Sequence, residues 1–154
     1  MIIAVPAGIS GLGLVEYVQR VDTILLPVLP YPIDSHAAAH FIPDLLLVGK
    51  IRSSGVRLAV VANRVRENTR VFKDLERFLD TLKLPLVATL RDSQNYIRAA
   101  EKGLGIYELE KSRTKPDRER WDSLVDWLDQ FEATDERQSS AQLAGVVPIG
   151  AGGG

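Results

Sequence analysis

The sequence predicts an α/β fold with three layers, in which helices flank a parallel sheet. Short apolar runs alternate along the chain with segments of helical periodicity. The apolar runs are continuous rather than alternating, which is typical of parallel strands buried on both faces. Short connections between them favour right-handed strand–helix–strand crossovers.

The apolar runs give the expected strands. The first reads Ile2-Ile3-Ala4-Val5 and leads into a turn. The next three cover residues 23–29, 57–62 and 85–90, and residues 106–109 form a short fifth candidate. Each run is four to seven residues long, the usual length of a buried strand.

Helices are expected between these strands, over residues 12–20, 34–54, 69–82, 93–102 and 117–131. Asp34 is a suitable N-cap for the second helix, Gly55 ends it, and Pro43 should kink or restart it. In the third helix an apolar face recurs with a period of 3.6 residues. That face consists of Val71, Leu75, Phe78, Leu79 and Leu82.

The last helix places Trp121, Leu124, Val125, Leu128 and Phe131 on one face. After it the chain becomes polar and then glycine-rich, a composition that cannot bury enough apolar surface to fold. We therefore expect one domain over residues 1–132 and a disordered tail over residues 133–154.

Composition narrows the class of protein. The 154 residues are 45% hydrophobic and 25% charged, with a net charge of -1 and no cysteine. Such a chain has no overall field for nucleic acid or anionic membranes, and it can form neither disulfides nor thiolate metal sites. It shows no secretory signal and no membrane-spanning apolar run, so we expect a soluble, cytoplasmic protein without a membrane partner.

A phosphate loop is missing from the sequence. The pattern Gly-x-x-x-x-Gly-Lys-Ser/Thr occurs nowhere, and Gly49-Lys50 is followed by Ile51 instead of a hydroxyl side chain. A phosphate loop needs glycine amides around the phosphates, a lysine, and a hydroxyl group for Mg²⁺. The chain therefore lacks the motif that P-loop enzymes use to bind triphosphates.

Gly8, Gly11 and Gly13 lie between the first strand and the first helix, where a dinucleotide-binding loop would lie. Glu16 stands where such a loop needs its third glycine. The preferred interpretation is a tight strand-to-helix turn.

His36 and His40 are four residues apart on the second helix and face the same way, with Asp44 as the only nearby carboxylate. Zinc sites need three or four protein ligands, so we expect no metal site. A Ser-His-Asp hydrolase is not supported either, because no Gly-x-Ser-x-Gly elbow is present.

Basic residues gather at the carboxyl ends of two expected strands, where open α/β sheets bind their ligands. They are Arg64, Arg66, Arg70 and Lys73 after the third strand, and Arg91, Arg98 and Lys102 around the fourth helix. They can meet phosphates of a nucleotide or of DNA, or they can be solvated charges paired with Glu67, Asp74, Glu76 and Glu101. Asn63 follows the third strand and can either pair with an adenine edge or cap the loop.

Taken together, these segments resemble the later part of a ParA/MinD-type deviant Walker P-loop ATPase. The resemblance covers residues 2 to about 109 and lies in the order and spacing of its parts. The parts are Ile2-Ile3-Ala4-Val5-Pro6-Ala7-Gly8, Val21-Asp22-Thr23-Ile24-Leu25-Leu26-Pro27-Val28, Val60-Val61-Ala62-Asn63-Arg64, Ala88-Thr89-Leu90-Arg91, and Tyr96 through Ala100 with Gly103 and Ile106. This resemblance implies a partial P-loop NTPase fold without the phosphate-loop strand.

The resemblance also implies a function. Members of this family are ATP-dependent dimers that position plasmids, chromosomes or other cargo, bind DNA non-specifically and respond to a partition partner. ATP and Mg²⁺ are thus the implied cofactors, Gly8, Asn63 and Arg64 the implied nucleotide contacts, and Arg91 and Arg98 the implied DNA contacts. Ala4-Val5 occupy the family's Asp-Thr positions, and alanine offers Mg²⁺ no oxygen ligand.

We therefore expect a truncated ParA-like protein that does not hydrolyse ATP alone and has no catalytic residue of its own. The alternatives are a non-catalytic protein-interaction module, a gene fragment without independent function, and a regulator that takes phosphate contacts from a second chain. An exposed apolar edge next to residues 2–5 would invite dimerisation.

Overall fold

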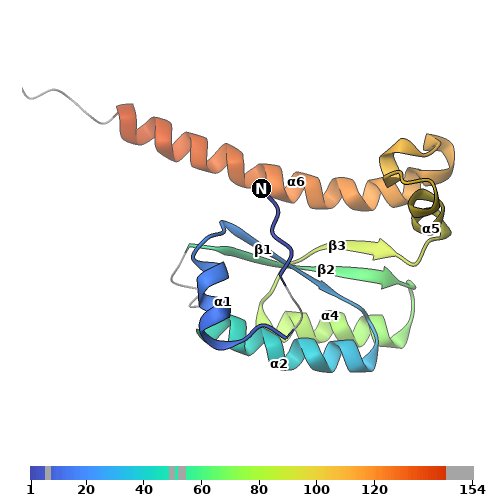
Figure 1. Ribbon diagram of the computed structural model, residues 1–154, viewed down its shortest axis with the longest axis horizontal. Helices are drawn as coiled ribbons and strands as arrows, with labels where there is room; N and C mark the ends of the chain where they lie inside the picture. The colour runs from blue at the N-terminus through green and yellow to red at the C-terminus, as the bar shows by residue number, and fades with distance from the viewer. Residues whose placement is uncertain (6–7, 49–50, 52–54, 145–154) are drawn as a thin grey trace, which may run out of the picture.

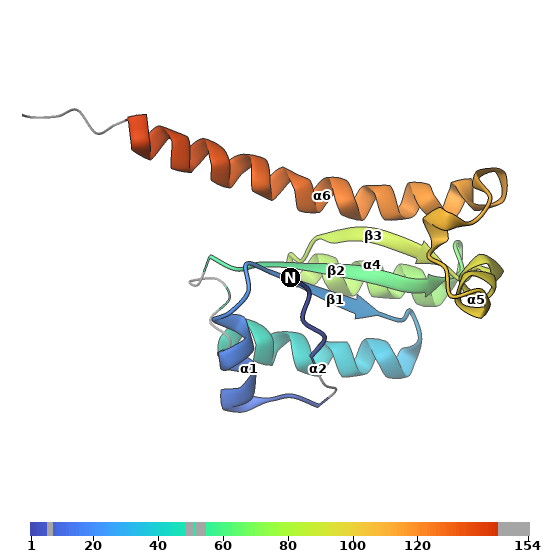
Figure 2. The ribbon, with the colours of Figure 1, turned by 45° about the horizontal axis from the view of Figure 1, so that its top comes forward.

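The computed structural model describes residues 1–5, 8–48, 51 and 55–144, and it confirms the three-layer α/β architecture. Three parallel strands form one sheet in the order β1 (Thr23–Val28), β2 (Arg57–Val65), β3 (Leu86–Arg91). Helices α2 (Pro32–Val48) and α4 (Arg70–Leu82) lie on one side of the sheet, and α6 (Lys111–Ala144) crosses the other side (Figure 1). The tilted view in Figure 2 shows the same three layers.

Each side of the sheet has its own hydrophobic core. Towards α2 and α4, the strands bury Val28, Val60, Ala62 and Val65 against Ala38, Ile42, Leu75 and Leu79. Towards α6, they bury Val61, Ala88 and Leu90 against Leu124. Helix α1 (Gly11–Val18) adds Leu14 and Val18 to a third cluster with Leu45, Ile51 and Leu58. Strand β2 is buried on both faces, as its continuous apolar sequence predicts.

The predicted first strand is wrong. Residues 1–5 have no regular structure, and Ile2 is 99% exposed. A strand needs a neighbour for its backbone N–H and C=O groups, and in the described chain no strand pairs with these residues. Their apolar sequence alone does not create one.

The fifth candidate strand is also wrong, because Ile106–Glu108 form the 3-10 helix η1. The Glu108 carboxylate accepts a hydrogen bond from the Gly105 N–H at 2.6 Å, which closes this short turn. Ile106 is buried at 8% exposure. Ile106 is apolar because this single turn buries it, and in the sequence such a residue cannot be told from part of a short buried strand.

The helices fall close to their expected positions. Helix α4 is capped by Lys83 in the left-handed conformation, and α5 (Gln94–Glu101) begins after Ser93, whose hydroxyl accepts the Asn95 N–H. Helix α2 begins two residues before Asp34 and continues through Pro43, while residues 49–50 and 52–54, part of the predicted helix, lie outside the described residues. No helix in the described part of the chain is long and apolar enough to cross a bilayer.

Helix α6 is longer than predicted at both ends. It begins at Lys111 and continues to Ala144, so the expected domain boundary at residue 132 falls within it. Val125, expected on the buried face, is 43% exposed, and the side chain of Phe131 lies outside the described residues. The remainder of the expected tail, residues 145–154, also lies outside the described residues.

Candidate functional site

A cavity of about 740 Å³ opens at the carboxyl ends of the strands, beside the start of α6. Its apolar walls come from Leu25 and Pro27 of β1, Val61 of β2, Leu90 of β3, and Ile97, Trp121 and Leu124 of the covering helices. Its polar groups are Asn63, Arg64, Arg91, Asp92, Ser93 and Tyr96. Apolar walls with a few converging polar groups are typical of small-molecule sites.

A bulge in β2 places Asn63 and Arg64 at the cavity. Ala62 pairs with Thr89 and Val65 pairs with Arg91, so two residues of β2 lie opposite the single residue Leu90. Arg64 takes the left-handed conformation, with φ of 52°, which costs an L-residue about 1–2 kcal/mol. The Arg64 N–H donates to Asn63 Oδ1 at 2.9 Å, which partly offsets that cost. The sequence predicted a strand end at residue 62, whereas the strand continues past this bulge.

Asn63 keeps hydrogen-bonding capacity for a ligand. An amide oxygen has two lone pairs and an amide nitrogen two protons, so the bond from Arg64 uses only one of these four. The side chain can therefore present both an acceptor and donors to one edge of a planar base, the pairing that its position in the sequence suggested.

The rim of the cavity carries paired charges. Asp92 accepts hydrogen bonds from Arg66 Nε and Nη2 at 3.1 and 3.0 Å, and Arg64 Nε lies 3.8 Å from its other oxygen. Away from the cavity, in α4, Arg70 pairs with Asp74, one of the carboxylates expected from the sequence. The arginine side chains here are 64–95% exposed, so each pair contributes about 0–1 kcal/mol. The Arg64 guanidinium stays accessible to a bound anion.

Asp117 is fully buried and binds two residues that line this cavity, Arg91 and Ser93. Its Oδ1 accepts two hydrogen bonds from Arg91, at 3.1 and 3.2 Å. Its Oδ2 accepts one from Ser93 Oγ at 3.0 Å and one from Asn95 Nδ2 at 2.7 Å. One carboxylate thereby joins the end of β3, the start of α5 and the first part of α6.

Tyr96 and Trp121 form an aromatic wall. Trp121 Nε1 donates to the Tyr96 hydroxyl oxygen at 3.1 Å. Burial, the largest effect, raises the pKa of Tyr96 above 10.0, and the charge of Asp117 raises it further, although the hydrogen bond from Trp121 and the charge of Arg91 oppose them. The Tyr96 hydroxyl therefore remains protonated at neutral pH and can donate a hydrogen bond to a ligand.

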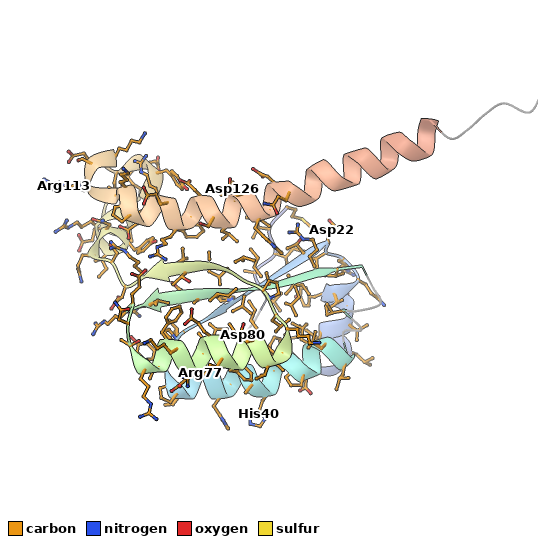
Figure 3. The ribbon with its side chains drawn as sticks, turned by 180° about the vertical axis from the view of Figure 1, so that it is seen from behind. Asp22, His40, Arg77, Asp80, Arg113 and Asp126 are labelled. Atoms are coloured by element: carbon orange, nitrogen blue, oxygen red, sulfur yellow. The ribbon has the colours of Figure 1, made fainter. Side chains whose placement is uncertain are left out.

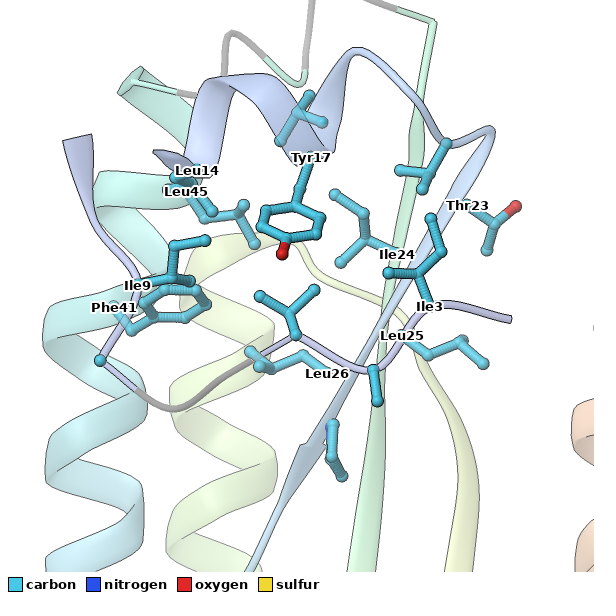
Figure 4. Close-up of a pocket in the computed structure, with 16 residues that line it drawn as sticks. Ile3, Ile9, Leu14, Tyr17, Thr23, Ile24, Leu25, Leu26, Phe41 and Leu45 are labelled. Carbon is cyan, nitrogen blue, oxygen red and sulfur yellow. The ribbon is translucent and has the colours of Figure 1, made fainter. Parts of the chain in front are cut away.

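Gly8 lies apart from this cavity. It lines a second cavity of about 680 Å³ beside β1, together with apolar residues of the N-terminal segment, α1 and α2 (Figure 4), and the two cavities share only Leu25 and Pro27 among their lining residues. Ile3, Ile9, Leu14, Tyr17 and Phe41 gather there. Gly8 has a φ of 80°, which fits the tight turn predicted for this segment.

The two expected DNA contacts also differ in their surroundings. Arg91 is held by Asp117 and its side chain is 37% exposed, whereas Arg98 lies on the exposed surface of α5. Asn63, Arg64 and Arg91 are thus brought together at one cavity, and Arg98 does not line it.

The residues that line the cavity fit the base and ribose of a nucleotide better than its phosphates. The cavity offers apolar walls, an amide and a phenol to a base and ribose. Among the residues that line it, the carboxylate of Asp92 is already paired with Arg66 and Arg64, and the Ala4 side chain has no oxygen to contribute. These groups offer fewer contacts to Mg²⁺ and a triphosphate than to a base and ribose.

Sequence reasoning missed Asp117, Tyr96 and Trp121 as parts of one site. The helical periodicity predicts only that Trp121 faces the core, and Asp117 stands only at the expected start of that helix. Residues 110–120 are rich in charged side chains, and nothing in the sequence distinguishes the one buried carboxylate, Asp117, from its exposed neighbours. Its burial depends on how the helix packs on the sheet.

A scan against protein-family models and a search of curated proteins found no match for this chain.

Proposed function

We propose that this chain is a ParA/MinD-like protein that binds the base and ribose of an adenine nucleotide without hydrolysing ATP. The observation that carries the proposal is the cavity at the carboxyl ends of three parallel strands, with Asn63 and Tyr96 facing an apolar wall. Ligands bind at this end of open α/β sheets, where the loops after the strands converge. The order of the sequence segments that resemble the ATPase family supports adenine as the base.

The proposed binding has a clear chemical signature. The base meets Asn63 and stacks on apolar and aromatic walls, while the exposed Arg64 guanidinium attracts the first phosphate. No phosphate loop occurs in the sequence, and the Asp92 carboxylate at the cavity is paired with arginine, so we expect the outer phosphates to add little binding energy. Adenosine, ADP and ATP should therefore bind with affinities within about tenfold of one another, an energy range of about 1.4 kcal/mol.

Isothermal titration calorimetry tests this proposal with adenosine and ATP, each with and without Mg²⁺. We expect saturable binding that Mg²⁺ does not strengthen, and phosphate release no faster than in a blank without protein. Asn63→Ala should weaken adenosine binding by about 5- to 10-fold, the value of one or two hydrogen bonds. Tyr17→Phe is the matched control, because Tyr17 lines the other cavity.

Two results would contradict the proposal. One is absence of adenosine binding at millimolar concentration in a folded protein. The other is tight binding that requires both Mg²⁺ and the γ-phosphate, especially with steady turnover, which would indicate a complete ATPase site.

The family role in positioning plasmids, chromosomes or cargo, with a partition partner, belongs to the same proposal. Of the two arginines that the resemblance suggested for DNA, Arg98 is exposed and Arg91 is engaged by Asp117. Arg98→Ala should therefore weaken binding to non-specific duplex DNA and lower the salt dependence by about one phosphate contact. If the wild type and Arg98→Ala bind DNA with equal affinity, Arg98 does not contact DNA.

A second candidate function is a non-catalytic interaction module, and it is favoured by the outer edge of β1, which pairs with no strand in the described part of the chain. The Arg57 N–H donates to the Asp22 C=O, so alternate residues from Ile24 point their backbone groups towards β2. Thr23, Leu25 and Pro27 then face the outer edge, where the missing N–H of Pro27 costs no hydrogen bond within the sheet. Such an edge can accept a strand from another chain.

Sedimentation over a wide range of protein concentration tests that candidate. Self-association through the edge would give a dimer, and addition of a charge by Thr23→Lys, at the start of that edge, should abolish it. A protein that stays monomeric at the highest concentration would rule out self-association as the role of this edge.

A further inference from the structure

His36 and His40 form an isolated pair on the outer surface of the molecule. They lie one helical turn apart on α2, and both are exposed. Figure 3 shows His40 projecting away from the sheet. They are also the two histidines of the whole chain, which contains no cysteine. All the imidazole groups of the protein are therefore at one place.

The two rings converge through the same type of nitrogen. His36 Nε2 and His40 Nε2 are 3.1 Å apart, the ring centroids are 4.6 Å apart, and the ring planes are inclined at 81°. One ring donates a hydrogen bond to the other. A spacing of four residues permits this contact but does not impose it, because exposed side chains can turn apart.

The separation of the two nitrogens matches two adjacent positions of a coordination sphere. Metal–imidazole bonds are about 2.0–2.1 Å long. Two such bonds to nitrogens 3.1 Å apart enclose an angle of about 95–102° at the metal, between octahedral and tetrahedral values. Both nitrogens can therefore bind one ion once the exposed rings turn so that each lone pair points at the metal.

We propose that His36 and His40 form a bidentate site for a transition-metal dication that prefers imidazole, with Cu²⁺ and Ni²⁺ ahead of Zn²⁺. In the described part of the chain no third histidine or carboxylate completes the group, so water fills the other positions. The site is open and exchangeable, unlike a structural zinc site with three or four protein ligands.

The fold holds the pair in place. Between the histidines, Ala38 is 7% exposed, and two residues after His40, Ile42 is fully buried in the core shared with β2 and α4. This burial fixes both the helical conformation and the outward face of α2. A metal that binds only when the turn is helical must also stabilise the folded protein by linkage.

Calorimetric titration of the untagged full chain with Ni²⁺ alone tests the site. We expect one saturable site, with affinity reduced at least tenfold in His36→Ala and in His40→Ala. Asp44→Asn is the control on the same helix and should change the affinity less than twofold. Ni²⁺ should also raise the melting temperature of the wild type but not of either histidine variant.

The substituted side chains are exposed, and circular dichroism will verify that each variant is folded. No saturable binding to the wild type at millimolar Ni²⁺ would overturn the proposal, as would equal affinity of the wild type and either histidine variant. A loss in Asp44→Asn as large as in the histidine variants would also overturn it, because the ligand set would then be different.

Discussion

Replacement of Asp117 by alanine is the most informative perturbation of the site. Asp117 is fully buried and accepts hydrogen bonds from Arg91, Ser93 and Asn95. Alanine removes the acceptor for all three and leaves a guanidinium without its carboxylate. The variant therefore removes the contact that joins α6, β3 and α5 without changing any other side chain.

The expected cost follows from these contacts. Removal of one partner of a fully buried ion pair costs about 3–5 kcal/mol. The Arg91 side chain is 37% exposed and can regain water, so we discount this to about 2–4 kcal/mol. For a chain of this length, that loss corresponds to a decrease in melting temperature of about 5–15 °C.

Urea unfolding followed by circular dichroism measures the change in the free energy of unfolding. Asp126→Ala is the matched control, since Asp126 is exposed on the same helix (Figure 3) and should change stability by at most about 0.5 kcal/mol. Equal stability of the two variants would refute the view that Asp117 holds the site together.

Three further predictions concern stability. Leu124→Ala should cost about 2–5 kcal/mol in urea unfolding because Leu124 is buried between α6 and the sheet, whereas exposed Val125→Ala should cost less than about 1 kcal/mol; equal costs would place α6 elsewhere. Burial, together with the hydrogen bond to Asp122 and its charge, raises the pKa of Tyr107 to about 12, so the folded state holds this proton more tightly. This contribution to the free energy of unfolding is fully present below pH 10 and is lost as the pH rises towards 12. Tyr107→Phe should therefore make the free energy of unfolding fall less steeply between pH 10 and 12. An equally steep fall in the variant would contradict this assignment. Lys83→Gly should raise the melting temperature through a gain of about 0.5–1 kcal/mol, because Lys83 has a φ of 55°; a lower melting temperature would show that its side chain contributes to packing.

Much of the fold could be predicted because it depends on local patterns. Strands β1, β2 and β3 are continuous apolar runs, and α4 has one apolar face, so each element carries its own signal. The wrong strand at residues 2–5 has the same kind of apolar run. Whether such a run becomes a strand depends on a neighbour in the sheet, and a single sequence does not specify which neighbours are present.

The site was only partly predictable. Asn63, Arg64 and Arg91 follow or end strands, and parallel topology brings the ends of neighbouring strands together. Asp117 and Trp121 reach the same place only because α6 crosses the sheet, a tertiary arrangement without a local signal. The bulge that turns Asn63 and Arg64 towards the cavity likewise depends on pairing with β3.

Amide chemical shifts during a titration with adenosine test the central claim most directly. We expect saturable shifts concentrated at Asn63, Arg64, Asp92, Ser93 and Tyr96, with little change at Gly8 or along α2. Shifts confined to the cavity around Gly8 and Tyr17, or none at millimolar adenosine, would contradict it.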